Sequence, residues 1–274
     1  MDNYSKILEY YNMLHQDREL WEIFFTNDYP IPYKNLTLYP VKLDLYFFFS
    51  YFSNCLKVPH LTSGDIKAIT MSYLEYLFYL ITEKNQSEYA YMLGELLLLT
   101  LKKNKTYIDS NNNEQDTIRF LFNKKTIEIE GIEYNSKDFD IIREIILLQN
   151  GSELPDETID PDLLNAYYEK IKLDTKTAKY KMGKLDDNIN IVIALTSYTR
   201  DNIFNLTIRT FLKLYDRCCL IMKFKLETLL VPYMEKKDKD NIIPYNADTT
   251  KTLKERIRES FETLGELEKK VKNK

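Results

Sequence analysis

The chain has 274 residues, a formal net charge of −4 and an apolar content of 44%. This length and apolar content are enough for one large domain or two small ones with a substantial core. The nearly balanced charge excludes a polycation that coats nucleic acid and also an acidic disordered tail. With 22 Tyr, 14 Phe and one Trp, the sequence supplies a large area for burial and predicts a folded protein.

The first hundred residues predict a mainly helical body. Apolar residues recur there at three- and four-residue spacing, which is the period of a helix with a buried face. Three prolines within residues 29–41 exclude a helix and predict an extended edge segment or a clamp laid across helices. Within residues 2–25, a helical stripe at 4–14 is followed by a dense apolar cluster at 21–25, and the further predicted helices cover residues 44–56, 66–80 and 87–103. The predicted helix over residues 66–80 is apolar nearly all round, so we expect it in the centre of the fold, with Thr62 or Ser63 as its cap.

The pattern changes over residues 105–134. Apolar residues alternate there on both sides of a turn at residues 123–125, and this period of two predicts a hairpin of two or three strands. A sheet of this size is not stable alone, so one face is expected to lie on the helices. The sheet is then either a surface decoration or an edge offered to a strand of a partner.

Helical patterns return after the predicted hairpin. Asn135 or Ser136 caps the first helix, and Asp160-Pro161 begins the second because a capping carboxylate precedes Pro in the first turn. The Lys-rich stretch 172–184 is the best internal boundary. The predicted helices cover residues 136–149, 161–171 and 186–196, and after a short turn at 199–204 a long helix begins at Asn205 or Thr207 and ends at residue 231. The last helix is expected to bury a broad side made of Phe211, Leu214, Cys218, Ile221, Met222 and Lys225.

The C-terminal part differs from the body. Residues 235–248 are polar and contain Pro, which predicts a linker. Residues 249–272 then show an uninterrupted helical pattern that would be about 35 Å long. Its apolar stripe is too narrow to be stable alone, so the helix must dock either on its own body or on another chain. The candidate partner-binding residues are Leu253, Ile257, Phe261, Leu264 and Val271.

Together these elements predict a mainly α fold. It consists of a multi-helix body, a small β-hairpin or three-stranded insertion at about 105–134, and a C-terminal amphipathic helix. Three parts are expected: an N-terminal helical body with the β insertion, a second helical block packed on it, and the linker with its helix. They cover residues 1–171, 185–232 and 233–274.

Residue types that carry common chemistry are sparse. The three cysteines include no CxxC pair, and His15 and His60 stand apart in the sequence, so neither a disulfide framework nor a zinc site is predicted. None of the six glycines belongs to a phosphate-binding motif. The sequence therefore predicts no catalytic centre, no metal and no cofactor. An enzyme acting on nucleic acid or cell wall would require a cleft that brings together Asp138, Asp140, Asp186 and Asp187.

Neither a secretion signal nor a membrane span is predicted. Charged residues interrupt the first 14 residues, where a signal would be apolar. The runs LYFFFSYF at 45–52 and LLLLTL at 96–101 are much shorter than the roughly 20 residues that cross a bilayer. Both runs are interpreted as buried helix, and the protein is expected to be soluble and to occupy a reducing compartment.

Five segments share their spacing and apolar pattern with a known group of proteins: YPIPYKNLTLYPV (29–41), IKAITMSYLEYL (66–77), DFDIIREIILLQN (138–150), PDETIDPDLL (155–164) and residues 184–217. They resemble proteins from the tail or baseplate assembly region of tailed phages of low-GC Gram-positive bacteria. The resemblance covers about residues 29–230. It implies a tail or baseplate hub assembly chaperone, or a virion-associated protein, without a catalytic motif.

Two functions are expected from these observations. The first is an assembly factor in the host cytoplasm that binds another phage tail or baseplate protein through apolar helical surfaces. The second is a permanent structural component of the virion tail or baseplate. Neither function requires a membrane or a specific nucleic acid, and a homo-oligomer stays an open alternative.

Overall fold

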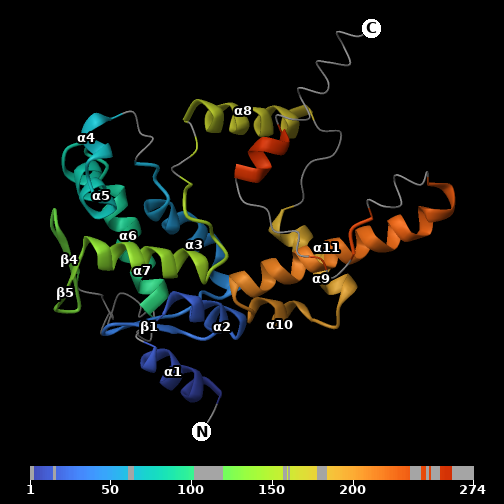
Figure 1. The fold of residues 1–274 in the computed structure, drawn as a ribbon, viewed down its shortest axis with the longest axis horizontal. Coiled ribbons are helices and arrows are strands. Elements are labelled where there is room, and N and C mark those ends of the chain that lie inside the picture. The colour runs from blue at the N-terminus through green and yellow to red at the C-terminus, as the bar shows by residue number, and fades with distance from the viewer. Residues whose placement is uncertain are drawn as a thin grey trace, which may run out of the picture. The chain divides into compact units, whose positions relative to one another are not determined.

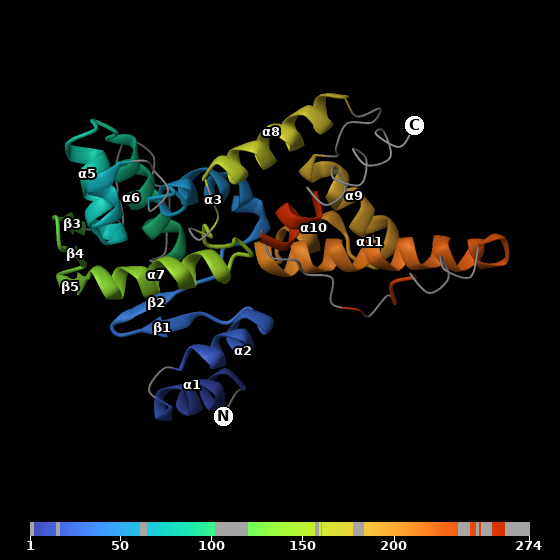
Figure 2. The same cartoon turned by 45° about the horizontal axis from the view of Figure 1, so that its top comes forward.

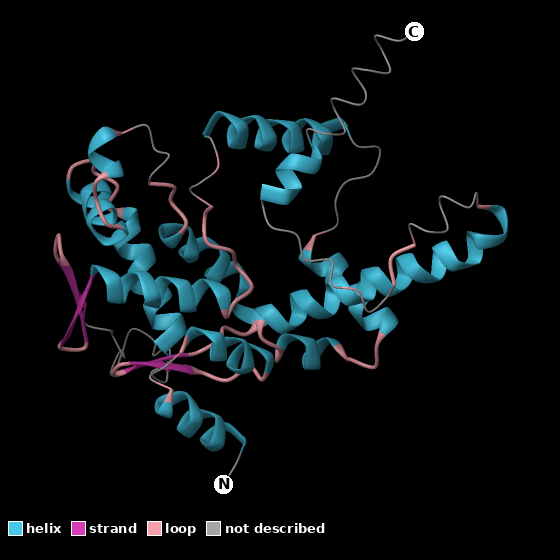
Figure 3. Ribbon diagram, viewed as in Figure 1, coloured by secondary structure: helices cyan, strands magenta, loops and turns pink. Residues whose placement is uncertain are grey.

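In the computed structural model, the described residues are 3–14, 17–60, 65–101, 120–156, 159, 161–177, 184–234, 242–244, 247 and 254–260. This part of the chain is mainly helical, with a two-stranded hairpin and a three-stranded antiparallel sheet (Figure 1 and Figure 3). The mainly α fold with a small β insertion that the sequence predicts is confirmed. The predicted helix over residues 249–272 lies mostly outside the described residues, of which 254–260 are helical.

Contacts divide the chain into two compact units. Unit 1 consists of Met1–His60, Gly64–Pro155 and Thr199–Lys213, and unit 2 consists of Leu61–Ser63, Asp156–Tyr198 and Leu214–Lys274. These two units differ from the three parts expected from the sequence, because each unit combines segments that are far apart in the chain. The segment 199–213 belongs with the N-terminal body because its side chains and backbone form hydrogen bonds with that body.

Unit 1 begins with two short α-helices, α1 (Asn3–Met13) and α2 (Trp21–Thr26), which contact each other through aromatic side chains. The 3-10 helix η1 (Arg18–Leu20) lies between them in the sequence. Asp17 caps η1 by accepting a hydrogen bond from the Glu19 amide over 3.0 Å. Trp21 and Tyr11 are both buried, and Trp21 Nε1 donates to the Tyr11 hydroxyl over 3.0 Å. This bond gives the indole N–H of the buried ring a partner and joins the two helices.

The Pro-containing segment forms a hairpin of β1 (Ile31–Tyr33) and β2 (Leu36–Leu38). Ile31 stands opposite Leu38 in an antiparallel register, and both side chains are fully buried. Just after β2, the Tyr39 amide donates to the Thr100 carbonyl over 2.7 Å. The segment is therefore extended, as predicted, and it is joined to the end of a helix.

The central helices of unit 1 are η2 (Leu43–Leu45), α3 (Tyr46–Phe52), η3 (Ser53–Leu56), α4 (Ile66–Ile69), α5 (Tyr73–Thr82) and α6 (Glu88–Leu101). The prediction of one helix over residues 66–80 is wrong, because a capping box interrupts it at Ser72. The Ser72 hydroxyl accepts from the Glu75 amide over 3.3 Å, and the Glu75 carboxylate accepts from the Ser72 amide over 2.9 Å. These reciprocal bonds begin a new helix at the next residue.

The three-stranded sheet has the order β3 (Phe120–Phe122), β4 (Thr126–Ile129) and β5 (Ile132–Asn135), and α7 (Ser136–Leu148) follows it directly (Figure 2). Ile127, Ile129 and Tyr134 are fully buried, so one face of the sheet packs on the core, as predicted. The Asn135 side chain accepts from the Lys137 amide over 2.9 Å and from the Asp138 amide over 3.1 Å. Asn135 is therefore the cap of α7, as the sequence predicts. Residues 105–119 lie outside the described part.

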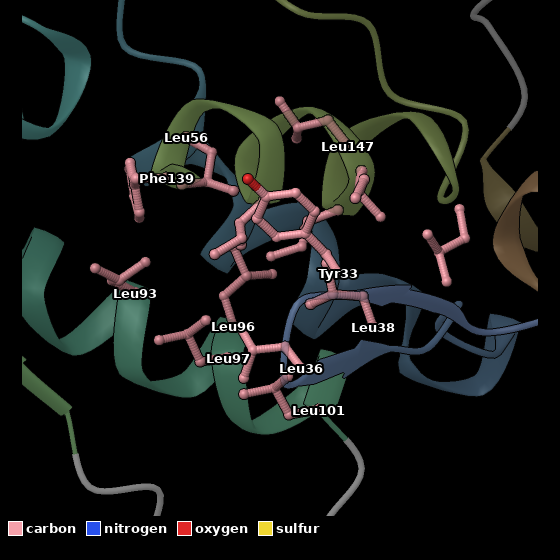
Figure 4. Packing of buried hydrophobic residues seen from close by; sticks show 14 of the residues in the cluster. Tyr33, Leu36, Leu38, Leu56, Leu93, Leu96, Leu97, Leu101, Phe139 and Leu147 are labelled. Atoms are coloured by element: carbon pink, nitrogen blue, oxygen red, sulfur yellow. The ribbon is translucent and has the colours of Figure 1, made fainter. Parts of the chain in front are cut away.

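The core of unit 1 forms where α6, α7 and the β1–β2 hairpin meet (Figure 4). Each element contributes side chains that are at most 9% exposed, and burying one such side chain stabilises the fold by roughly 1.5–3 kcal/mol. The residues labelled in this core are Tyr33, Leu36, Leu38, Leu56, Leu93, Leu96, Leu97, Leu101, Phe139 and Leu147. The run at residues 96–101 is thus part of the core, as predicted.

A late segment of the chain completes unit 1. It contains α10 (Arg200–Phe204) and the first turns of α11 (Ile208–Leu230). The hydroxyls of Thr207 and Thr210 donate to Asp28 Oδ1 over 2.6 and 2.8 Å. The Arg209 guanidinium bonds the Glu22 carboxylate over 2.8 Å, and the Ile208 amide donates to the Val41 carbonyl over 3.0 Å. These bonds between residues far apart in sequence place 199–213 in unit 1.

Unit 2 contains α8 (Pro161–Thr177), α9 (Leu185–Leu195), the rest of α11, the 3-10 helix η4 (Val231–Tyr233) and the helical residues 254–260. The helix α8 starts at Pro161, as predicted. The buried apolar residues of this unit among those described are Ile159, Ile189, Val192, Cys218, Leu220 and Ile257. Met222 and Lys225, which were expected on the buried side of α11, are exposed, Met222 to 38%, because this part of the helix buries the side that carries Leu220.

Candidate protein-binding surface

The partner-binding stripe predicted for the C-terminal helix is described at one position only. Ile257 lies in the helical residues 254–260 and is 2% exposed, so its side chain is covered by the chain itself. Nearby, Lys170 Nζ of α8 bonds the Ser260 carbonyl over 2.6 Å and the Ser260 hydroxyl over 2.7 Å. Leu253, Phe261, Leu264 and Val271 lie outside the described residues, and their role in binding a partner stays a prediction.

A different surface of unit 1 carries exposed aromatic side chains. Phe47, Phe48 and Tyr51 of α3 are 76%, 50% and 53% exposed, and Tyr91 of α6 is 61% exposed. We name these four residues the aromatic patch. Single exposed apolar side chains are common on proteins, but contiguous exposed apolar area is typical of surfaces that bind a partner.

The rings of the aromatic patch are joined through one buried residue, Phe52. The centroid of the Phe52 ring lies 6.3 Å from that of Phe48, 5.5 Å from that of Tyr51 and 5.9 Å from that of Tyr91. Phe47 adds to the same group through Phe48, with ring centroids 6.1 Å apart. The patch is therefore one connected surface that spans two helices, and its rings are fixed by aromatic contacts.

The exposure of these rings follows from the sequence YFFFSYF of α3. A helix on the surface of a domain buries one face only, so a segment that is aromatic on all sides must leave some rings outside. Phe49 and Phe52, three residues apart, are buried, whereas the neighbouring Phe47, Phe48 and Tyr51 are exposed. The prediction that the whole run is buried helix is wrong for these three residues.

Three acidic side chains neighbour the aromatic patch along its own helices. Residues three or four apart on a helix are surface neighbours, which places Asp44 beside Phe47 and Phe48, and places Glu88 and Glu95 on either side of Tyr91. Within the described part of the chain, none of the three carboxylates forms an ion pair. The rim of the patch is therefore negatively charged and open to a positively charged partner.

The four carboxylates that an enzyme would require have structural roles or lie exposed. Asp138 accepts hydrogen bonds from the Tyr33 hydroxyl over 2.8 Å and from Lys34 Nζ over 2.6 Å. Asp140 is exposed on α7. At the start of α9, Asp187 accepts from the Lys184 amide over 2.7 Å, and Asp186 accepts from the Asn190 side chain over 3.3 Å. Among the described residues, no group of three or more His, Cys, Asp or Glu is placed to hold a metal ion.

The pKa of the buried Asp138 carboxyl reflects two opposing effects. Burial alone would raise this pKa, but the hydrogen bonds from Lys34, Tyr33 and the Asn135 amide outweigh burial and hold it below the usual range. A carboxyl with a depressed pKa in the folded state stabilises the fold at pH values above its pKa in the unfolded chain, about 3.9. This stabilisation is lost as pH falls toward the lower, folded-state pKa.

We therefore expect a pH-dependent effect of Asp138→Asn. The difference in free energy of unfolding between the native chain and the variant should be constant from pH 7 to about pH 5, and should shrink below about pH 4. Urea unfolding at a series of pH values measures it. A difference that stays unchanged down to pH 3 would mean that the ionised carboxylate of Asp138 does not stabilise the fold.

No helix within the described ranges is long and apolar enough to cross a bilayer. The candidate surface that the sequence did not predict is the aromatic patch, and the signal that could have revealed it is the all-round aromatic character of α3. No protein-family model, no curated protein and no solved structure matches the chain. A proposal about the function of the protein therefore depends on the geometry and chemistry of the aromatic patch.

Proposed function

We propose that the protein is a non-enzymatic assembly factor of a phage tail or baseplate, and that it binds a tail component through exposed apolar helical surface in the host cytoplasm. The aromatic patch carries this proposal, because four connected rings stand 50–76% exposed. Aromatic side chains are enriched in protein interfaces, and Tyr is among the residue types enriched in their hot spots. The resemblance of residues 29–230 to tail and baseplate proteins supports the choice of partner.

The acidic rim defines the chemistry of the segment that would contact the patch. Asp44, Glu88 and Glu95 have no cationic partner of their own among the described residues. A partner segment with apolar side chains at its centre and Lys or Arg at its margins would cover the rings and neutralise the rim. An amphipathic helix offers both groups at fixed spacing. The patch thus favours a basic amphipathic helix of the tail component.

Co-expression with each neighbouring tail and baseplate protein tests the proposal. We expect the native chain to raise the soluble recovery of one of them and to co-purify with it. The double variant Phe47→Ser/Phe48→Ser should reduce co-purification at least tenfold, since the loss of two aromatic anchors costs roughly 2–4 kcal/mol of binding free energy. Quantitative pull-down at fixed concentrations measures the ratio.

The matched control is Ile66→Ser/Ile69→Ser on α4. These two side chains are 83% and 49% exposed, close to the 76% and 50% of Phe47 and Phe48, but they lie outside the aromatic patch. The control should retain co-purification. Equal losses in both double variants, or no effect of the native chain on any neighbouring protein, would contradict the proposal.

A permanent place in the virion is the second candidate. The edge strand β3 favours it, because the sheet order is β3-β4-β5 and no other described strand pairs with β3. Such an edge can accept a strand of a neighbouring subunit. Mass spectrometry of purified particles separates the two functions: an assembly factor should be absent, whereas a structural component should be present in stoichiometric amount.

A further inference from the structure

The part of α11 that belongs to unit 2 carries a second exposed apolar stripe. Cys219 is exposed, and Met222, Leu226 and Leu229 are 38%, 57% and 72% exposed. Their spacing of three, four and three residues places them on one stripe of the helix and matches the apolar positions of a coiled-coil heptad. We name these four residues the α11 seam.

The seam is distinct from the side by which α11 packs in unit 2. The opposite side of the helix carries Leu220, which is buried, and Ile221 and Phe224, which are half-buried. An amphipathic helix of a globular domain needs one apolar face for its own core. The seam adds a second face, and its exposure shows that no described residue covers it. An exposed face with coiled-coil spacing is the face that another helix would cover.

Lysine side chains flank the seam. In a coiled coil, the residues next to the apolar positions meet the flanking residues of the partner helix. Lys223 follows Met222 and Lys225 precedes Leu226, and both side chains are exposed. Lys223 makes one long contact to Glu227 of the same helix, 3.8 Å, and Lys225 forms no ion pair with a described residue. The centre of the seam therefore has two lysines that a partner could pair.

Self-association would give these lysines no counter-charge from the second copy. In a parallel pair of two α11 helices, Lys225 would face Leu230 and Lys223 would face Cys218 of the other copy. In an antiparallel pair, like flanking positions face each other and lysines would meet lysines. A helix of another protein with Asp or Glu at these positions would give both lysines an opposite charge.

We propose that the α11 seam binds an amphipathic helix of another protein that has an apolar 3.5-residue repeat flanked by Asp and Glu. The contact is a short two-stranded coiled coil over the last turns of α11. It goes beyond the proposed function, since it involves a different surface and would exist even if the aromatic patch bound nothing. A partner segment this short is only marginally helical alone, so we expect it to fold on binding with a dissociation constant in the micromolar range.

Two synthetic peptides of about three heptads test the proposal with the full-length protein. Both have Leu at the apolar positions, and their flanking positions are all Glu in one and all Lys in the other. We expect the Glu peptide to bind at least tenfold more tightly than the Lys peptide in fluorescence anisotropy at low salt. The variant Lys223→Glu/Lys225→Glu should reverse this preference.

Two further variants locate the binding on the seam. Leu226→Ser should weaken binding of the Glu peptide at least tenfold, whereas Leu173→Ser on α8 should leave it unchanged, although the two leucines are similarly exposed at 57% and 60%. Both variants should keep the thermal midpoint of the native chain, because neither side chain is buried. The variant Phe47→Ser/Phe48→Ser should bind the Glu peptide normally, which separates this test from that of the aromatic patch.

Three results would overturn the proposal. The first is binding of neither peptide, and the second is equal binding of both. The third is a dimer in sedimentation velocity that Leu226→Ser dissociates, because a second copy of this chain would then occupy the seam.

Discussion

Replacing Phe139 with Ala is expected to lower the free energy of unfolding by about 4 kcal/mol. The Phe139 side chain is 1% exposed in the core of unit 1, and its ring stacks on that of Tyr73 with centroids 6.5 Å apart. Truncation removes this packing and leaves a cavity that the surrounding helices can fill only in part. Urea unfolding followed by the fluorescence of the single Trp, the buried Trp21 of unit 1, measures the loss.

The control for this prediction is Phe47→Ala in the aromatic patch. Phe47 is 76% exposed, so the same truncation should change the free energy of unfolding by less than about 0.5 kcal/mol. The pair compares one residue type in two environments. If Phe47→Ala were as destabilising as Phe139→Ala, Phe47 would be buried in solution, and the aromatic patch would not be a free surface.

The variant Asp138→Ala is expected to lower the free energy of unfolding by about 3 kcal/mol at pH 7. The carboxylate accepts bonds from the Tyr33 hydroxyl, Lys34 Nζ and the Asn135 amide. Its removal leaves the Tyr33 hydroxyl, on a side chain that is 9% exposed, without this acceptor. The Lys34 side chain is half-exposed, so its ammonium can form hydrogen bonds with water instead. Most of the lost stability therefore comes from the unpaired Tyr33 hydroxyl and from the weakened cap of α7.

A double-mutant cycle with Tyr33→Phe checks this assignment. In the Tyr33→Phe background, Asp138→Ala should cost about 1–2 kcal/mol less than in the native chain, because the buried hydroxyl is no longer left unpaired. Asp138→Asn, which keeps an acceptor for Tyr33, should cost about 1.5 kcal/mol. Strict additivity of the two substitutions would show that Asp138 and Tyr33 do not interact.

Local signals in the sequence predicted where several helices begin. Asn135 immediately precedes α7 and Pro161 is the first residue of α8, and both starts were predicted from residues adjacent in the chain. The alternation before α7 likewise predicted the small sheet. The break before α5 was missed although Ser72 and Glu75 have the spacing of a capping box. The apolar period of the flanking residues continues across Ser72 and conceals the interruption.

Features made by residues far apart in the chain could not be predicted. The bonds from Thr207 and Thr210 to Asp28 join residues about 180 positions apart, and no local pattern marks such a pair. They explain why the start of α11 belongs to unit 1. Likewise, composition shows that α3 is aromatic on all sides, but contact with α6 decides which of its rings are buried. The helix α3 could therefore be predicted from the sequence, whereas the aromatic patch on it could be found only in the structure.

The position of Phe52 beneath the aromatic patch has a thermodynamic consequence. Its ring holds Phe48, Tyr51 and Tyr91 in place, so these side chains have already lost much of their rotational freedom in the unbound protein. Association would then carry a small entropic cost for ordering side chains. Dehydration of the rings would dominate, and its calorimetric signature is a negative change in heat capacity.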